Sequence, residues 1–131
     1  MKKVLMIGTG GTIASDISPE GLTPELNAEQ LLSAVPRIAQ LCRVECVELY
    51  ALDSTNLRPE HWLGIARTIR ENYGKYDGFV ISHGTDTMAY TAAALSYLIQ
   101  GAGKPIMLTG AQKPINYDST DSKLNLTDAF V

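Results

Sequence analysis

Short apolar runs alternate with amphipathic stretches along this chain, and this alternation restricts the fold more than any other feature of the sequence. Each apolar run ends at a glycine or a polar turn. Apolar residues at helical spacing follow, in segments that begin near Asn27, Pro59 and Met88. A last helix is expected near Asp121. Strand followed by helix, several times over, is typical of a parallel sheet with helices on both faces. We therefore predict an α/β fold whose buried strands cover residues 3–8, 44–49, 78–82 and 104–108.

The helix boundaries carry their own signals, and one segment between them lacks any. Asn27 is a typical N-cap residue, Gln30 is its capping-box partner, and Pro36 ends that helix. Pro59 suits the first turn of the next helix. Residues 9–26 show little periodicity and several turn-forming residues, so we expect a long loop there. Loops of this length are often lids or binding loops.

Composition argues against several classes of function. The 131 residues suit one domain, and 45% hydrophobic with 19% charged residues can bury a core. The net charge is −3 and Lys and Arg form no stripe, so no nucleic-acid partner is expected. The apolar run after Lys3 is too short for a signal peptide or a membrane span, which predicts a cytoplasmic protein without a membrane partner. Cys42 and Cys46 form no C-x-x-C pair and are expected to be buried free thiols.

A parallel sheet brings the polar turns of this chain to one edge, because ligands of such sheets bind at the carboxyl ends of the strands. The turn after the first strand contains Thr12 and several glycines, which allow a close approach of the backbone. Ser54 and Thr55 follow the second strand, and Thr85 and Asp86 follow the third. We therefore predict a ligand site at this edge, formed by residues 8–15, 53–56, 83–87 and 109–111.

The residue types in these turns favour hydroxyl chemistry. The chain has no G-x-x-x-x-G-K-[ST] phosphate loop, and Ile13 interrupts the glycine pattern of a dinucleotide-binding turn. Metal-ligand spacing is absent, and His83 is expected to form local hydrogen bonds rather than to catalyse. A threonine hydroxyl becomes a nucleophile when a base accepts its proton and when donors face the oxyanion. Asp86 is placed to pair with a substrate amino group, and donors at Ser54 and Thr55 with a substrate carboxylate. The residues alone therefore indicate a hydrolase or a binding protein for a small zwitterion.

Two segments and the turn between them resemble the bacterial-type L-asparaginases. Residues 9–14, Thr-Gly-Gly-Thr-Ile-Ala, and residues 83–88, His-Gly-Thr-Asp-Thr-Met, resemble the two signatures of that family. The turn at residues 53–55 resembles its substrate-binding turn in the form of the cytosolic type I members. The resemblance runs from Met1 to Val131 with the family's order and spacing. It implies the conversion of L-asparagine to L-aspartate and ammonia.

The resemblance also implies roles for individual residues. Thr12 is the expected nucleophile, which forms an acyl-enzyme on the side-chain amide of the substrate. Thr85 and Asp86 are expected to form a second catalytic group and to bind substrate, Asp86 through the α-amino group. The α-carboxylate is expected at Ser54. No metal or cofactor is implied. The expected substrate-binding residues, with backbone groups near the first and last of them at the oxyanion, are Gly11, Asp53, Ser54, Thr55, Thr85, Asp86 and Ala111.

The chain departs from this family in two respects. Many relatives carry a tyrosine that assists the nucleophile, and this chain has Gly21-Leu22 at the comparable place, as some type I members do. Family members are also much longer, and continue into a lysine that completes a Thr-Lys-Asp group and into a C-terminal domain. We therefore expect residues 1–131 to be the N-terminal domain of a homo-oligomeric enzyme, truncated before its C-terminal domain and inactive or weakly active alone.

Two other functions stay open at this point. One is the asparaginase-like subunit of a tRNA amidotransferase, which an extra domain before the first signature would favour; here the first strand starts at Lys3, which speaks against it. The other is a non-catalytic module that binds a small amino acid. The presence of Thr12, Thr85 and Asp86 together argues against that module.

Overall fold

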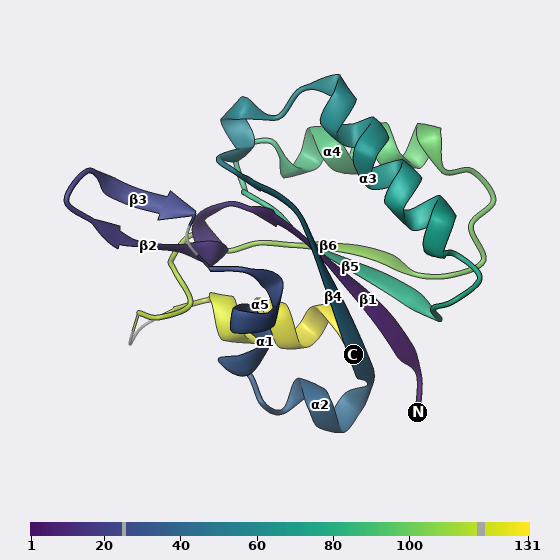
Figure 1. Ribbon diagram of the computed structural model, residues 1–131, viewed down its shortest axis with the longest axis horizontal. Coiled ribbons are helices and arrows are strands. Elements are labelled where there is room, and N and C mark those ends of the chain that lie inside the picture. The colour runs from purple at the N-terminus through teal and green to yellow at the C-terminus, as the bar shows by residue number, and fades with distance from the viewer. Residues whose placement is uncertain (25, 118–119) are drawn as a thin grey trace.

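The chain folds around a four-stranded parallel sheet (Figure 1). The structure is a computed structural model that describes residues 1–24, 26–117 and 120–131. In spatial order the strands are β4 (Arg43–Leu52), β1 (Lys3–Gly10), β5 (Gly78–Ser82) and β6 (Ile106–Thr109). They overlap all four strands expected from the sequence, which confirms the α/β fold.

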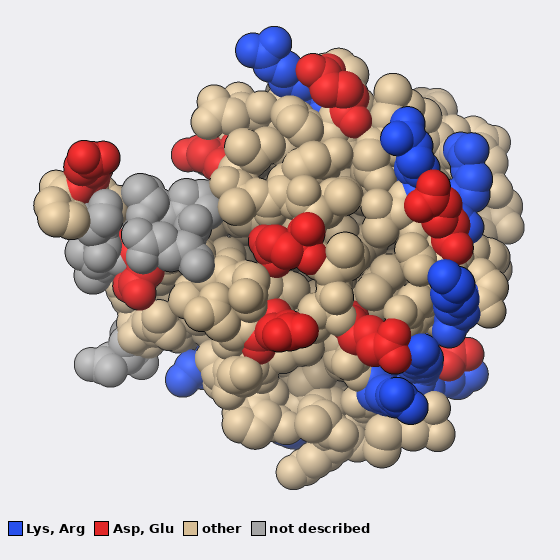
Figure 2. Space-filling view, in the orientation of Figure 1, with Lys and Arg blue, Asp and Glu red and all other residues tan. Residues whose placement is uncertain are grey.

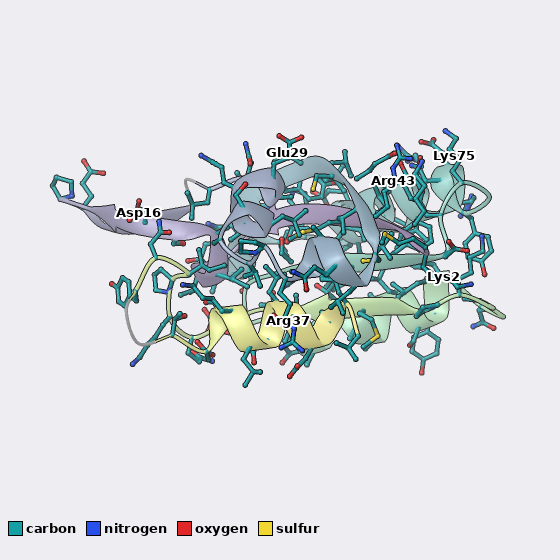
Figure 3. All side chains as sticks on the ribbon, turned by 90° about the horizontal axis from the view of Figure 1, so that it is seen from below. Lys2, Asp16, Glu29, Arg37, Arg43 and Lys75 are labelled. Carbon is teal, nitrogen blue, oxygen red and sulfur yellow. The ribbon has the colours of Figure 1, made fainter. Side chains whose placement is uncertain are left out.

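Helices cover both faces of this sheet (Figure 1). One face carries α3 (Pro59–Asn72) and α4 (Met88–Leu98), and the other carries α1 (Ala28–Ser33), α2 (Ile38–Leu41) and α5 (Ser122–Ala129). The predicted capping box is present: the Asn27 side chain accepts from the Gln30 backbone at 2.9 Å, and the Gln30 side chain accepts from the Asn27 backbone at 2.8 Å. The exposed side chain of Glu29, in the first turn of α1, points away from the sheet in Figure 3.

Each face of the sheet buries its own apolar core, because successive residues of a strand point to opposite faces. Leu5 and Ile7 of β1 pack with Ile69 of α3, whereas Met6 packs with Leu126 of α5. All five residues are at most 4% exposed. Burial on both faces explains why the inner strands appear as continuous apolar runs in the sequence.

The prediction of one long loop over residues 9–26 was wrong. After the turn that follows β1, a short 3-10 helix (η1, Thr12–Ala14) leads into an antiparallel hairpin of β2 (Ser15–Ser18) and β3 (Gly21–Pro24). The hairpin protrudes from the body of the molecule (Figure 1), so its strands are held by backbone pairing and need no apolar alternation. Gly21, at φ +113°, permits the reversal between them. The short helix α2 was also missed, because four residues are too few to show a helical period.

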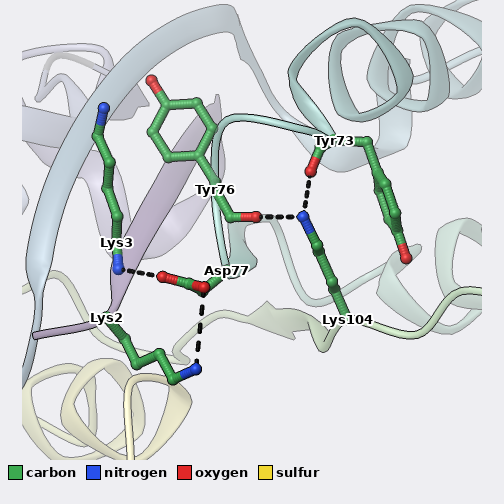
Figure 4. A network of polar contacts seen from close by, with 6 residues as sticks. All are labelled: Lys2, Lys3, Tyr73, Tyr76, Asp77 and Lys104. Atoms are coloured by element: carbon green, nitrogen blue, oxygen red, sulfur yellow. Dashed lines mark hydrogen bonds and ion pairs between the residues drawn. The ribbon is translucent and has the colours of Figure 1, made fainter.

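A polar network fastens the amino-terminal end of the sheet (Figure 4). Lys104 donates through Nζ to the carbonyl oxygens of Tyr73 and Tyr76, the latter at 2.8 Å, and lies 4.7 Å from the centre of the Tyr73 ring. The Lys3 backbone donates to the Asp77 carboxylate at 2.8 Å. These contacts tie the turn before β5 to β1 and to the segment that precedes β6. Among the described residues, no helix has the length and apolar character needed to cross a membrane.

Replacement of Lys104 by methionine is expected to lower the free energy of unfolding by about 1–2 kcal/mol, because two carbonyl groups lose a charged donor while the aliphatic stem is kept. Urea unfolding at an unchanged m-value measures this change. The matched control is Lys75→Met at an exposed neighbouring position, where a change of at most about 0.5 kcal/mol is expected. Equal effects of the two substitutions would contradict the role given to Lys104.

Candidate active site

The polar turns after β1, β4 and β5 surround one small pocket at the carboxyl edge of the sheet. Its volume is about 180 Å³. Most Lys and Arg side chains on the face shown in Figure 2 lie near the amino ends of the strands, whereas the pocket itself contains two carboxylates. The residues that line it are Gly11, Thr12, Ser15, Asp53, Ser54, Gly84, Thr85 and Asp86.

Glycines allow the three turns to pack closely against one another. Gly11 has φ +83°, and a Cβ atom there would lie 2.4 Å from the backbone nitrogen of Gly84. A Cβ atom on Gly84 would in turn lie 2.6 Å from the Cβ of Ser54. Both distances are far below any normal contact, so no other residue fits at either position without displacing a turn. The close packing of Gly11, Gly84 and Ser54 therefore sets the spacing of the side chains around the pocket.

The two threonines near the carboxyl end of β1 have different surroundings. Thr9 is buried and donates to the carbonyl of Ser82 at 2.7 Å, so it fastens β1 to β5. Thr12 begins the short helix η1 and lines the pocket. The Gly11 N–H donates to the carbonyl of Leu52 at 3.0 Å and so holds the turn against β4. Of these two threonines, Thr12 lines the pocket.

The turn after β4 is locked to the turn after β5. Ser54 is 2% exposed, its Oγ accepts from the Thr87 backbone at 3.3 Å, and its carbonyl accepts from the Thr87 hydroxyl at 2.8 Å. Asp53 lines the pocket and accepts, through Oδ1, from the backbone N–H and the hydroxyl of Thr55 at 3.0 and 2.9 Å. Thr55 is exposed and does not line the pocket. Its two hydrogen bonds to Asp53 orient that carboxylate.

Thr85 and Asp86 both line the pocket, as expected from the sequence. The Thr85 hydroxyl accepts from the Gln112 side chain at 3.3 Å, which connects it to the segment after β6. Ala111, in contrast, is 1% exposed and packs in the core with Ile115, outside the pocket lining. The fourth predicted turn, residues 109–111, thus contributes Ala111 to the core beneath the site and not to the pocket lining.

Three residues with contacts at the site were not named individually from the sequence, although Ser15 and Gly84 lie within the predicted ranges 8–15 and 83–87. Ser15 lines the pocket and donates to the Gly11 carbonyl at 2.8 Å; its place three residues after Thr12 was an available signal. Gly84 lines the pocket too, and its position inside the second signature was the signal for it. For Gln112 the sequence carries no signal, because its contact with Thr85 depends on the approach of β6 to β5.

His83 is fully buried at the end of β5 and, as expected from the sequence, forms local hydrogen bonds. Its Nδ1 lies 2.6 Å from the Gly84 carbonyl oxygen and its Nε2 2.7 Å from the Thr91 hydroxyl. Burial lowers the pKa of the imidazole below its ordinary value. Within the described part of the chain, no group of three or more His, Cys, Asp or Glu residues could hold a metal ion.

The protein is expected to lose stability as the pH falls below about 6.5, the ordinary pKa of histidine. Because the pKa of His83 is lowered by burial, the unfolded chain takes up a proton at a higher pH than the folded chain, and the free energy of unfolding decreases over that interval. Both observed ring partners, the Gly84 carbonyl and the Thr91 hydroxyl, are uncharged. Urea unfolding at pH values of about 7.5 and about 5.5 measures the loss, which should be smaller in His83→Asn. Identical losses in the parent and in this variant would contradict the assignment.

Comparisons with known proteins agree with this fold. A family model described as "Asparaginase, N-terminal" matches residues 3–131. The chain is 44% identical to a subunit of the glutamyl-tRNA(Gln) amidotransferase of Pyrococcus abyssi, over 96% of this chain and 30% of that protein. It is 42% identical to L-asparaginase of Thermococcus kodakarensis, over 98% of this chain and 39% of that protein. The structure is similar to the crystal structure of the probable cytoplasmic L-asparaginase of Campylobacter jejuni, with a TM-score of 0.91, 35% identity, and coverage of 99% of this chain and 41% of that one.

The chain belongs to the asparaginase family, whose N-terminal part it matches. It spans between about three and four tenths of the length of these relatives. One relative is named as an asparaginase and another as part of an amidotransferase, so membership of the family defines the type of domain and leaves the specific activity to be argued from the site.

Proposed function

We propose that residues 1–131 form the N-terminal domain of a longer amidohydrolase, which converts L-asparagine to L-aspartate and ammonia. The observation that carries the proposal is that Thr12, Ser54, Thr85 and Asp86, from three separate turns, line one pocket of about 180 Å³. This set combines a hydroxyl nucleophile with groups suited to both ends of a small zwitterion.

The reaction proceeds through an ester on Thr12. Its Oγ attacks the amide carbon of the substrate, the C–N bond breaks, and ammonia leaves with the proton from the hydroxyl. Water then cleaves the ester, which releases aspartate and regenerates Thr12. Asp86 binds the α-amino group and Ser54 the α-carboxylate. Thr85 and Asp86 also belong to a second catalytic group, and Thr85 is held by Gln112.

We further propose that the enzyme is a cytoplasmic homo-oligomer and that residues 1–131 alone are inactive or weakly active. The longer relatives support this, because the chain covers only 39% of the asparaginase from Thermococcus kodakarensis. A positioned acid–base partner supplied by the remaining part would contribute about 10²–10⁴ in rate. Ammonia release from asparagine by the 131-residue chain and by the whole protein tests the point. Activity of the isolated chain within ~10-fold of the whole protein would contradict it.

A second candidate is the amidase component of a tRNA amidotransferase. The 44% identity to the amidotransferase protein of Pyrococcus abyssi favours it. The two candidates differ in what the reaction requires. A free asparaginase releases ammonia from asparagine by itself, whereas an amidotransferase component should be stimulated by its partner protein and by glutamyl-tRNA. Steady-state kinetics with asparagine and with glutamine, each with and without glutamyl-tRNA, separate them, and also establish which amide is preferred.

A further inference from the structure

A chain of hydrogen bonds runs from the helices on one face of the sheet to the pocket. Trp62 of α3 donates through Nε1 to the hydroxyl of Thr91 in α4 at 2.9 Å. That hydroxyl lies 2.7 Å from Nε2 of His83, and Nδ1 of the same ring lies 2.6 Å from the carbonyl oxygen of Gly84. Thr91 and His83 are both 0% exposed. The chain ends on the turn that carries Thr85 and Asp86.

The partners determine the direction of these hydrogen bonds. A carbonyl oxygen only accepts, so Nδ1 of His83 carries the proton that is donated to Gly84. In the neutral ring Nε2 is then an acceptor, and the Thr91 hydroxyl donates to it while accepting from Trp62. Each group in the chain therefore has its hydrogen-bonding capacity used in one consistent direction.

The carbonyl that receives the last hydrogen bond belongs to the peptide that joins Gly84 to Thr85. Since that peptide is planar, its orientation determines where the backbone of Thr85 starts. Gly84 is also packed against the two other pocket turns, because a Cβ atom on Gly11 would lie 2.4 Å from its nitrogen and its own Cβ would lie 2.6 Å from that of Ser54. A rotation of this peptide would therefore displace Thr85 relative to Thr12, and a misplacement of about 1 Å can lower a rate about 10²-fold.

We propose that His83 is a positioning residue, which orients the Gly84–Thr85 peptide through Nδ1 and is itself oriented by Thr91 and Trp62. It does not touch the substrate, since its side chain is fully buried and does not line the pocket. This inference rests on the proposed function, because Thr85 and Asp86 must act on the substrate for their position to matter.

Two substitutions of His83 distinguish the contribution of Nδ1 from that of Nε2. Asparagine retains an N–H donor near the place of Nδ1, whereas glutamine retains a polar group near the place of Nε2 and lacks the donor to Gly84. In the whole protein, His83→Gln is expected to lower kcat by ~10- to 100-fold with KM changed by less than ~3-fold, while His83→Asn stays within ~5-fold of the parent kcat. Loss of packing alone would affect His83→Asn at least as strongly as His83→Gln, because asparagine leaves the larger cavity at this buried position. Equal kcat values for His83→Asn and His83→Gln would overturn the proposal.

Thr91→Val keeps the shape of the side chain and removes the hydroxyl that orients the His83 ring. It therefore tests the same series of hydrogen bonds without a change at His83. We expect kcat to fall by ~3- to 10-fold at a nearly constant KM. The control is His61→Gln, at the other histidine of the chain, for which kcat within ~2-fold of the parent is expected. A parent-like kcat of Thr91→Val would count against the proposal even if His83→Gln failed to fold.

The tautomers of the two histidines provide a readout independent of activity. His61 accepts through Nδ1 from the backbone N–H of Arg58 at 2.8 Å, so its neutral form carries the proton on Nε2. Nitrogen-15 NMR of the labelled protein, at a pH where both rings are neutral, is therefore expected to show His83 protonated on Nδ1 and His61 on Nε2. The indole N–H of Trp62, the single tryptophan, should shift in Thr91→Val. Protonation of His83 on Nε2 would overturn the proposed direction of the hydrogen bonds.

These outcomes distinguish the inference from the proposed function. If the parent releases no ammonia from either amide, the proposed function fails and the positioning role fails with it. If the parent is active and Thr12→Ala is inactive, but the Asn and Gln variants of His83 are equal, the positioning role alone fails.

Discussion

In the whole protein, Thr12→Ala is expected to lower kcat by at least ~10³-fold, as the loss of other covalent nucleophiles does. Thr12 lines the pocket, and the turn is held by other residues: the Gly11 N–H donates to the Leu52 carbonyl, and the Ser15 hydroxyl donates to the Gly11 carbonyl. Removal of the Thr12 hydroxyl should therefore abolish chemistry without unfolding the turn. Ammonia release at saturating asparagine, with circular dichroism of the same sample, measures both.

The matched control for this substitution is Thr9→Val, three residues earlier at the carboxyl end of β1. Its hydroxyl is buried and donates to Ser82, so its loss should lower stability by about 1–3 kcal/mol and leave kcat within ~5-fold of the parent. Near-parent turnover in Thr12→Ala would remove Thr12 as the nucleophile. A collapse of activity in Thr9→Val, in a folded protein, would show that the turn rather than the Thr12 hydroxyl is what catalysis requires.

Asp86→Asn is expected to lower kcat/KM for asparagine far more than kcat/KM for succinamate, the analogue without the α-amino group. A hydrogen bond to a charged group contributes roughly 1.5–3 kcal/mol, which corresponds to about 10- to 150-fold in kcat/KM. Succinamate has no amino group for Asp86 to bind. The factor by which its kcat/KM falls should therefore be at least ~10-fold smaller than the factor for asparagine. The comparison of the two substrates in parent and variant measures the difference.

The other pocket carboxylate provides the control for Asp86. Asp53 accepts two hydrogen bonds from Thr55, so Asp53→Asn should disturb the turn and affect asparagine and succinamate alike. If Asp86→Asn also lowered kcat/KM for both substrates by the same factor, the α-amino group would have to be bound elsewhere. A larger selective loss in Asp53→Asn would move that role to Asp53.

The sequence predicted the parts of this molecule that depend on local pattern. Buried strands such as residues 78–82 are continuous apolar runs, and α1 begins at a capping box, so both could be predicted without a structure. Topology then brought Thr12, Ser54, Thr85 and Asp86 together, because parallel strands end at one edge.

The parts that were not predicted depend on contacts between distant segments. The hairpin of β2 and β3 is held by backbone pairing, which leaves no apolar period in the sequence. Gln112 reaches Thr85 across 27 positions of chain, and Ala111 faces the core rather than the pocket. The contact of Thr55 with Asp53 was likewise not predicted, and the expected role of Thr55 in substrate binding stays a prediction.

The central claim is that Thr12 forms an acyl-enzyme with asparagine, and trapping of that intermediate tests it most directly. The whole protein is incubated with asparagine in the presence of hydroxylamine, and a second sample is quenched in acid for mass analysis of its peptides. The account predicts aspartyl hydroxamate at the expense of aspartate, an aspartyl group on the peptide that contains Thr12, and neither product in Thr12→Ala. Release of aspartate and ammonia at the parent rate without hydroxamate, or an aspartyl group on a different residue, would contradict it.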